Sequence, residues 1–143
     1  MKPTESEWQQ KVWGQTRCVA RGPNGRACQA HAVAGGYSSR HHHPDQANTF
    51  FVLSGTLCVE SWNGRLPLGV PSTSVTIGPG QTYTAAAGLW HRFVAPEPVA
   101  MIETYSTTLP AREGPESPDI VRYDEGGVGS PPYGSTNDRE HTQ

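Results

Sequence analysis

The sequence predicts an all-β protein of one domain, a sandwich or barrel of short strands. Three observations support this prediction. Runs rich in β-branched and aromatic residues recur along the chain. Turn signals separate these runs about every 8–12 residues. No window after Trp13 has the period of an amphipathic helix. A length of 143 residues suits one domain with a real hydrophobic core.

The expected strands follow in order, each bounded by a turn signal. Gly22-Pro23-Asn24-Gly25 predicts a tight hairpin turn, Gly35-Gly36 a break, and Pro44–Gln46 a turn before a strongly apolar run. In the first half we expect strands at Thr16–Ala20, Ala27–Val33, Tyr37–His43, Thr49–Leu53 and Thr56–Trp62.

The second half continues the pattern. Asn63-Gly64, Gly78–Gly80 and Pro96–Pro98 mark turns, and residues 73–77 alternate between polar and apolar side chains. The expected strands are Thr73–Ile77, Thr82–Thr84, His91–Ala95 and Val99–Tyr105.

The two ends differ in composition from the centre. Residues 1–12 are polar and read as an N-terminal arm or a short helix, and residues 13–124 form the predicted domain. After Thr108 the chain is rich in Gly, Pro, Ser and charge, apart from one apolar island at Asp119–Tyr123. We expect the island to dock on the barrel and residues 125–143 to form a flexible tail.

Bulk properties exclude several classes of function. A formal net charge of −2 favours neither nucleic acid nor an anionic membrane. No apolar run approaches the length of a membrane-spanning helix, and the N-terminus has no apolar signal segment. The prediction is therefore a cytoplasmic protein. Three cysteines without a Cys-x-x-Cys pair argue against a disulfide framework and a thiolate zinc site.

Three histidines stand side by side at His41, His42 and His43. Imidazole is the commonest metal-ligating side chain at neutral pH. In a strand, His41 and His43 point to one face and His42 to the other. This stretch therefore predicts half of a metal site. His91 is the best candidate for a third ligand, because it opens a strand just after Gly88, a residue that permits a close turn.

The spacing of these residues resembles the two motifs of the cupin superfamily. The first motif, Gly-x5-His-x-His-x3–4-Glu-x6-Gly, is matched by Gly35, His41, His43, Asn48 and Gly55. The second, Gly-x5-Pro-x-Gly-x2-His-x3-Asn, is matched by Gly80, Ala86, Gly88, His91 and Ala95. The resemblance covers about residues 13–123 and implies a double-stranded β-helix, the jelly-roll barrel of cupins. It also implies a homodimer.

Within the superfamily, the sequence looks most like the C-terminal cupin of bacterial mannose-6-phosphate isomerase/mannose-1-phosphate guanylyltransferase proteins. The residues that carry this finer resemblance are Trp13-Gly14, Val52–Thr56, His91–Phe93, Met101–Glu103 and Asp119–Asp124.

The resemblance implies metal ligands at His41, His43, His91 and the position of Asn48, where the family has glutamate. An amide oxygen is a weaker ligand than a carboxylate and adds no charge. Asn48 is thus either a weak ligand or a polar pocket residue. The nitrogen-rich set suits a divalent transition metal, with Fe, Zn, Ni, Mn and Cu not distinguished.

Further residues are assigned by strand parity. Phe50, Val52 and Phe93 are expected to line the pocket, or simply to form the barrel core. Glu103 is a candidate catalytic carboxylate for acid–base work. Arg40 and Arg92 are expected to face away from the metal.

Three functions remain open, all with a small-molecule ligand. The first is a sugar-phosphate isomerase-like enzyme, which the presence of only two lysines, Lys2 and Lys11, weakens. The second is a three-histidine iron-dependent dioxygenase. The third is a non-catalytic ligand- or metal-binding cupin, because fold alone does not decide function.

Overall fold

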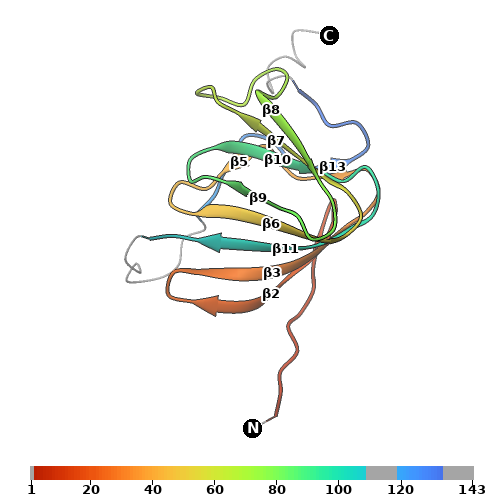
Figure 1. The fold of residues 1–143 in the computed structure, drawn as a ribbon, viewed down its shortest axis with the longest axis vertical. Coiled ribbons are helices and arrows are strands. Elements are labelled where there is room, and N and C mark those ends of the chain that lie inside the picture. Colours follow the sequence, from red (N-terminus) through yellow and green to blue (C-terminus); the bar gives the residue numbers. More distant parts are fainter. Residues whose placement is uncertain (1, 109–118, 134–143) are drawn as a thin grey trace.

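The computed structural model describes residues 2–108 and 119–133, and within these ranges all regular structure is β-strand (Figure 1). The predicted all-β jelly-roll fold is therefore confirmed. Residues 109–118 and 134–143, which include much of the predicted tail, lie outside the described residues.

The first sheet has the order β1-β2-β3-β11-β6-β9, and every neighbouring pair is antiparallel. Its central strands are β3, β11 and β6. Buried and more exposed side chains alternate along them, and β6 and β11 are rich in aromatic and β-branched residues. The strands are β1 (Gln9–Lys11), β2 (Gly14–Gly22), β3 (Gly25–Ala32), β6 (Ala47–Ser54), β9 (Thr82–Ala85) and β11 (Val99–Ser106).

The second sheet is centred on β10. One side of β10 pairs with β4 and β5, and the other side pairs with β7, which pairs in turn with β8. Two short strands near the C-terminus, β12 and β13, extend it by pairing with β5 and β4. The strands are β4 (Gly36–Tyr37), β5 (His41–His42), β7 (Leu57–Trp62), β8 (Thr73–Ile77), β10 (Trp90–Val94), β12 (Val121–Arg122) and β13 (Gly127–Val128).

The hydrophobic core lies between the inner faces of the two sheets. Its members alternate along each strand, as a sheet with one buried face requires. At about 25 cal/mol per Å² of apolar surface, this burial is the main stabilising term of the barrel. The core residues are Ala30, Ala32, Phe50, Val52, Leu57, Val59, Ile77, Phe93, Ala95, Val99 and Met101.

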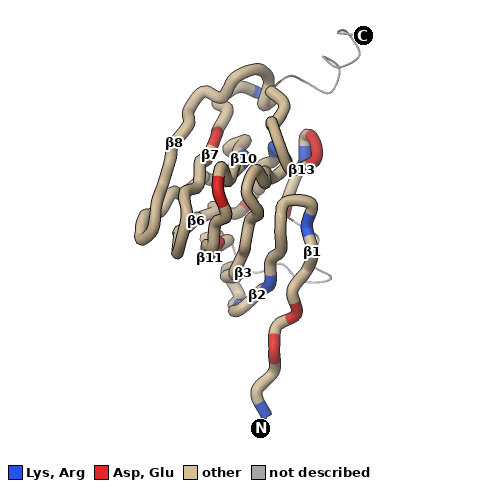
Figure 2. Tube along the Cα trace, turned by 90° about the vertical axis from the view of Figure 1, so that its right-hand side faces the viewer, with Lys and Arg blue, Asp and Glu red and all other residues tan. Residues whose placement is uncertain are grey.

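The N-terminal residues approach the barrel as an extended arm that ends in β1 (Figure 2). Gln9–Lys11 pairs with β2, so this part of the arm is a strand and not a helix. Trp8 packs its ring against His31, with ring centroids 4.8 Å apart, and the Arg17 guanidinium lies 4.4 Å from the centroid of the Trp8 ring. The arm therefore covers part of the outer face of the first sheet.

The charged residues are interspersed along the chain in Figure 2, with blue and red segments on both sheets. This agrees with the near-neutral formal charge of −2. In the parts of the chain that the structure describes, no helix is long and apolar enough to cross a membrane.

Candidate metal centre

His41 owes its inward direction to a β-bulge. Tyr37 pairs with Val94 and His41 pairs with His91, so four residue steps on one strand face three on its partner. The extra residue re-aims the side chains that follow, as bulges near functional sites commonly do. The continuous strand predicted over residues 37–43 is thus divided into β4 and β5, and His41 faces His91 directly.

His43 follows β5 and is held by two backbone contacts. Its carbonyl accepts a hydrogen bond from the Gly88 N–H at 2.8 Å, which ties the turn before β10 to the ligand strand. Gly88 has φ +83°, a conformation that favours glycine. The His43 ring is fixed from the other side, because its Nδ1 lies 2.8 Å from the Asp119 carbonyl oxygen.

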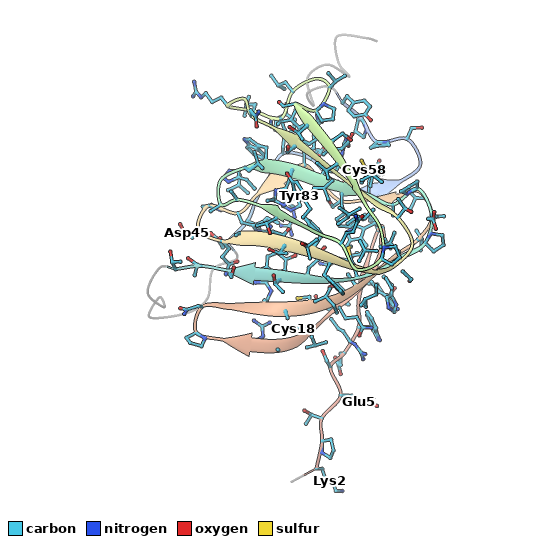
Figure 3. All side chains as sticks on the ribbon, in the orientation of Figure 1. Lys2, Glu5, Cys18, Asp45, Cys58 and Tyr83 are labelled. Atoms are coloured by element: carbon cyan, nitrogen blue, oxygen red, sulfur yellow. The ribbon has the colours of Figure 1, made fainter. Side chains whose placement is uncertain are left out.

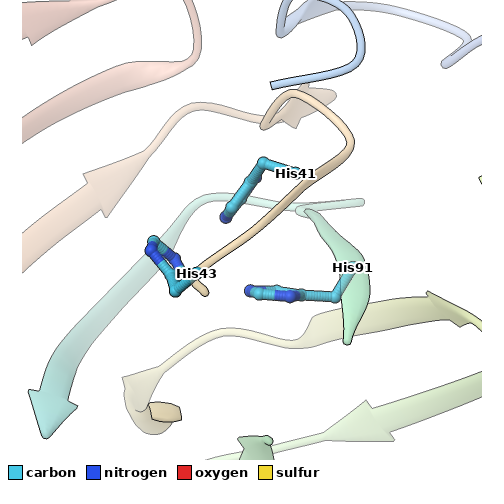
Figure 4. A group of neighbouring side chains, drawn as sticks. All are labelled: His41, His43 and His91. Atoms are coloured by element: carbon cyan, nitrogen blue, oxygen red, sulfur yellow. The ribbon is translucent and has the colours of Figure 1, made fainter. Parts of the chain in front are cut away.

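His91 completes the cluster from β10. The metal-binding nitrogens of His41, His43 and His91 all lie within 4.8 Å of one another, and the three side chains are buried. Figure 4 shows the three rings converging from the β5 segment and from β10. Three histidines are therefore positioned to bind one metal ion.

In each of the three imidazoles, Nδ1 forms a hydrogen bond with a backbone carbonyl, which leaves Nε2 to face the centre of the cluster. Nδ1 lies 2.7 Å from Ser39 O in His41, 2.8 Å from Asp119 O in His43 and 2.8 Å from Leu89 O in His91. A carbonyl only accepts, so each Nδ1 carries the proton and each Nε2 presents a lone pair. In metal sites, hydrogen bonds of this kind to the non-ligating nitrogen fix the tautomer and the orientation of the histidine ring.

The cluster also meets the chemical requirements of a cation site. His43 Nε2 is buried and has no hydrogen-bond partner among the described residues. Burial lowers the pKa of all three imidazoles, that of His91 to about 4 and that of His41 well below its usual range. All three are consequently neutral at pH 7, the form that binds a metal. The donor set fits a divalent transition metal.

Asn48 reaches the same point from β6 of the opposite sheet. Its Nδ2 donates to the Thr104 carbonyl at 3.3 Å, which turns Oδ1 toward His91, 3.1 Å from Nε2. Oδ1 and the unprotonated Nε2 are both acceptors, so they cannot bond to each other. A cation would satisfy both lone pairs. Asn48 Oδ1, a neutral oxygen, therefore lies beside the three nitrogens.

The predicted pocket residues separate into two groups. Phe50 and Phe93 line an open cavity of about 1160 Å³ that also includes His41, His43 and Asn48. Val52 lies deeper, fully buried in the hydrophobic core, and is not among the residues that line the cavity.

Glu103 faces the interior of the barrel and is 6% exposed, a direction that the residue pattern alone did not determine. It pairs with Phe50 on one side and with Cys28 on the other. The Tyr105 hydroxyl donates to its Oε2. Burial raises the pKa of Glu103, and burial followed by the nearby carboxylate raises that of Tyr105 well above its usual range. The Tyr105 ring lies 5.1 Å from that of His43, centroid to centroid. Glu103 and Tyr105 thus form a buried hydrogen-bonded pair beside the histidine cluster.

Sequence reasoning missed Tyr105, Arg26 and Asp119. Tyr105 shares the parity of Val99, Met101 and Glu103, so the alternation of β11 was a usable signal. Arg26 lines the cavity from β3. Its inward direction could be predicted only if the register of β3 on β11 were known. Asp119 acts through a backbone carbonyl, for which residue type gives no signal. Figure 3 shows two landmarks of the cavity, with Asp45 at the turn before β6 and Cys18 on β2.

Arg40 and Arg92 lie on the outer side of the second sheet, yet both are buried, with 1% and 0% exposure. The segment from Asp119 to Tyr133 covers them. Arg40 Nε binds Asp124 Oδ2 at 2.8 Å and its Nη1 binds the Tyr133 carbonyl at 2.9 Å. Arg92 forms an ion pair with Glu60 at 2.8 Å and donates to the Pro132 carbonyl. The predicted docking of residues 119–123 thus continues beyond residue 124.

The remaining histidines have structural surroundings. His42 points outward and its ring packs against Trp90, with centroids 4.4 Å apart. His31 stacks on Trp8, on the outer face of the first sheet. Cys18, Cys28 and Cys58 are free thiols, of which Cys28 is buried and the other two are partly exposed.

Comparison with known proteins places these features in a family. A family model described as a cupin domain matches residues 30–105. A search of curated proteins found no match. Among solved structures, KdgF from Halomonas sp. has a TM-score of 0.61 at 23% identity, covering 72% of this chain and 89% of that chain.

Two further structures are similar. An RmlC-like cupin from Shewanella frigidimarina has a TM-score of 0.61 at 17% identity, covering 76% of this chain and 87% of the other. The nucleoside dehydratase Pac13 has a TM-score of 0.64 at 15% identity, covering 85% and 87%. At these identities the likeness concerns the fold.

Proposed function

Because the chain belongs to the cupin family, we propose that it is a metal-dependent enzyme that moves a proton on a small oxygenated substrate, as an aldose–ketose isomerase does. The observation that carries this proposal is the Glu103–Tyr105 pair, which faces the cavity next to the three histidines. A site for ligand binding alone has no need of a buried carboxylate with a raised pKa at this position.

His41, His43 and His91 would hold a divalent ion through Nε2, with Asn48 Oδ1 beside them. Such an ion would supply Lewis-acid polarisation of a substrate carbonyl or hydroxyl oxygen. Glu103 would accept the proton of the hydroxyl-bearing carbon next to the carbonyl and return it to the former carbonyl carbon. The hydroxyl proton passes to the former carbonyl oxygen, so that aldose and ketose interconvert with no net gain or loss of protons. Its raised pKa brings it nearer to neutrality, where a general base is most effective. The Tyr105 hydroxyl holds Oε2 in place by donating to it.

The cavity wall carries both basic and acidic side chains, and the basic ones could contact an anionic substrate. The scarcity of lysine in the sequence counted against a phosphorylated sugar. However, Lys11 lines the cavity together with four arginines, at positions 17, 21, 26 and 122. Acidic side chains are also present, so the attraction depends on local placement and not on net charge.

The test begins with metal content. Purified protein is analysed for bound metal, stripped, reloaded with Mn²⁺, Ni²⁺, Zn²⁺ or Fe²⁺, and assayed for aldose–ketose interconversion by solvent deuterium exchange. We expect Glu103→Gln to abolish exchange while metal content is retained, and the exposed control Glu97→Gln to leave exchange unchanged. Full activity of Glu103→Gln would refute the assignment of the base.

A second candidate is the three-histidine iron-dependent dioxygenase. The observation that favours it is the neutral donor set, because Asn48 replaces a carboxylate and leaves only imidazole and amide ligands. Anaerobic loading with Fe²⁺, followed by oxygen-electrode measurements on a panel of small thiols and diols, tests it. Metal-replete protein that is inert in both assays supports the third candidate, a non-catalytic ligand- or metal-binding cupin.

Other expectations stay predictions. These are the homodimer, the cytoplasmic location, the lack of nucleic-acid and membrane partners, and the finer resemblance to the C-terminal cupin of mannose-6-phosphate isomerase-type proteins. The predicted domain limits at residues 12 and 124 also stay predictions. Size-exclusion chromatography with light scattering tests the first of them.

A further inference from the structure

A row of side chains crosses the inner face of the first sheet at the level of Asn48. On β11, Tyr105 is directly opposite Asn48 of β6 on one side and Arg26 of β3 on the other. Directly opposed residues share a face of the sheet. Arg26 therefore points to the same side as Asn48, two strands away, with about 10 Å between their backbones.

Arg26 lies over the aromatic ring of this row. Its Cζ is 4.1 Å from the centroid of the Tyr105 ring, and the side chain is partly buried in the cavity wall. Its charge acts on the site, since it lowers the pKa of both Glu103 and His43. The guanidinium thus lies over Tyr105, on the strand that also carries Glu103.

Arg26 makes no direct ion pair with a carboxylate in the described parts of the chain, and its nearest electrostatic partner of opposite charge there is the buried Glu103. Within residues 2–108 and 119–133, the arginine–carboxylate ion pairs are those of Arg40 with Asp124 and Arg92 with Glu60. A partly buried guanidinium that makes no direct ion pair is stabilised by an oxyanion that supplies one.

The guanidinium contacts the Tyr105 ring by cation–π attraction. Its five N–H donors match the oxygens of a carboxylate or phosphate in pairs. The ring also restricts the guanidinium, so that less conformational entropy is lost when an oxyanion binds. Lysine at this position would supply the charge but not the paired donors.

We propose that Arg26 binds the anionic group, carboxylate or phosphate, of a small substrate whose other oxygens face the histidine cluster. This inference rests on the proposed function, of which it specifies the substrate class. The separation within the row sets the distance between the two ends of that substrate at a few carbon atoms. Glu103 and Tyr105, between the ends, would then face the carbon atoms that exchange the proton.

The experiment is calorimetric titration of nickel-loaded protein with gluconate, glucose 6-phosphate and glucose. We expect one or both anions to bind at least tenfold more tightly than glucose. Tighter binding of gluconate alone would assign a carboxylate as the group bound by Arg26. Tighter binding of glucose 6-phosphate alone would assign a phosphate. Arg26→Gln should weaken the anion about 10- to 100-fold, as loss of a charge-assisted hydrogen bond does. It should leave nickel affinity and glucose binding unchanged, and Arg26→Lys should recover only part of the loss.

The control is Arg65→Gln, which removes the same charge from an exposed loop outside the cavity. Anion binding that is equal in wild type and Arg26→Gln, or that falls equally in Arg65→Gln, would overturn the proposal. So would a wild type that prefers glucose or binds none of the three. Failure of the metal site has a different signature, since nickel then does not bind, and titration of the metal-free protein with the same anions still tests Arg26.

Discussion

Replacing Asn48 by aspartate tests whether the amide oxygen belongs to the metal site. The two side chains have nearly the same shape, so the change replaces Nδ2 with an oxygen and adds a charge. In the metal-free protein this removes the donor to the Thr104 carbonyl and places a carboxylate 3.1 Å from the lone pair of His91 Nε2. We expect opposite effects on stability without metal and on affinity for metal.

The magnitudes follow from the surroundings of Asn48, which is 1% exposed. A buried acceptor that loses its donor costs about 1–3 kcal/mol of unfolding free energy. That corresponds to a fall in Tm of roughly 2–10 °C for a domain of this size. A unit charge about 4 Å from a divalent ion contributes about 8 kcal/mol at an effective dielectric of 20. Desolvation of the carboxylate removes several kcal/mol, so we expect metal to bind about 10- to 100-fold more tightly.

The assay compares wild type, Asn48→Asp and the exposed control Asn63→Asp at pH 8, where the three imidazoles are neutral. Tm is measured after removal of metal with a chelator, and affinity for Zn²⁺ or Ni²⁺ is measured by competition with a chelating dye. The control adds the same charge away from the cavity and should change neither quantity.

Two results would refute the reasoning. Unchanged metal affinity in Asn48→Asp would mean that Oδ1 does not face the ion. A metal-free Asn48→Asp protein as stable as wild type would mean that the hydrogen bond to Thr104 does not fix the amide. Tighter metal binding with lower metal-free stability is the outcome that the geometry requires.

Three further predictions follow from the same site. His91→Ala should lower metal affinity at least tenfold in the dye competition assay, and wild-type affinity in that variant would remove His91 from the ligand set. Metal-free protein should lose stability as pH falls from about 6.5 toward 4, because the unfolded chain takes up a proton that folded His91, with a pKa of about 4, does not. Urea unfolding at pH 7.5 and 4.5 should show a difference of about 2–3 kcal/mol from this group, reduced in His91→Gln. Asp119→Ala should weaken metal binding roughly tenfold, because the Asp119 carboxylate accepts from the Asp45 N–H and so holds the carbonyl that orients His43. Asp119→Asn should restore binding, and equal affinities in all three proteins would show that this contact is dispensable.

Much of the site followed from strand parity and motif spacing. The alternation of a strand placed His41 and His43 on one face and His42 on the other, and the structure has the first two inside and the third against Trp90. The motif spacing predicted His91 as the third ligand, because the turn at Gly88 determines where β10 begins. These features are local, so the amino-acid pattern contains them.

The features that sequence reasoning left out depend on contacts between distant segments. Parity gives the outward direction of Arg40 and Arg92 but not what covers them, and the cover comes from residues near the C-terminus. Arg26 joins the row of Tyr105 only through the register of β3 on β11. A one-residue slip would have sent its side chain to the other face. Register across a sheet is a tertiary property, which local patterns do not determine.

The contact between His43 and Asp119 also sets an order of events during biosynthesis. The two residues are 76 positions apart, which a ribosome working at about 5–20 residues per second needs roughly 4–15 s to translate. Until then the His43 ring has no carbonyl to orient it, and β5 has no β12 to pair with. We therefore expect the nascent barrel to emerge without a competent ion site and to acquire one only after residues 119–122 have been translated and have docked on β5, so that metal binding follows the folding of the earlier strands.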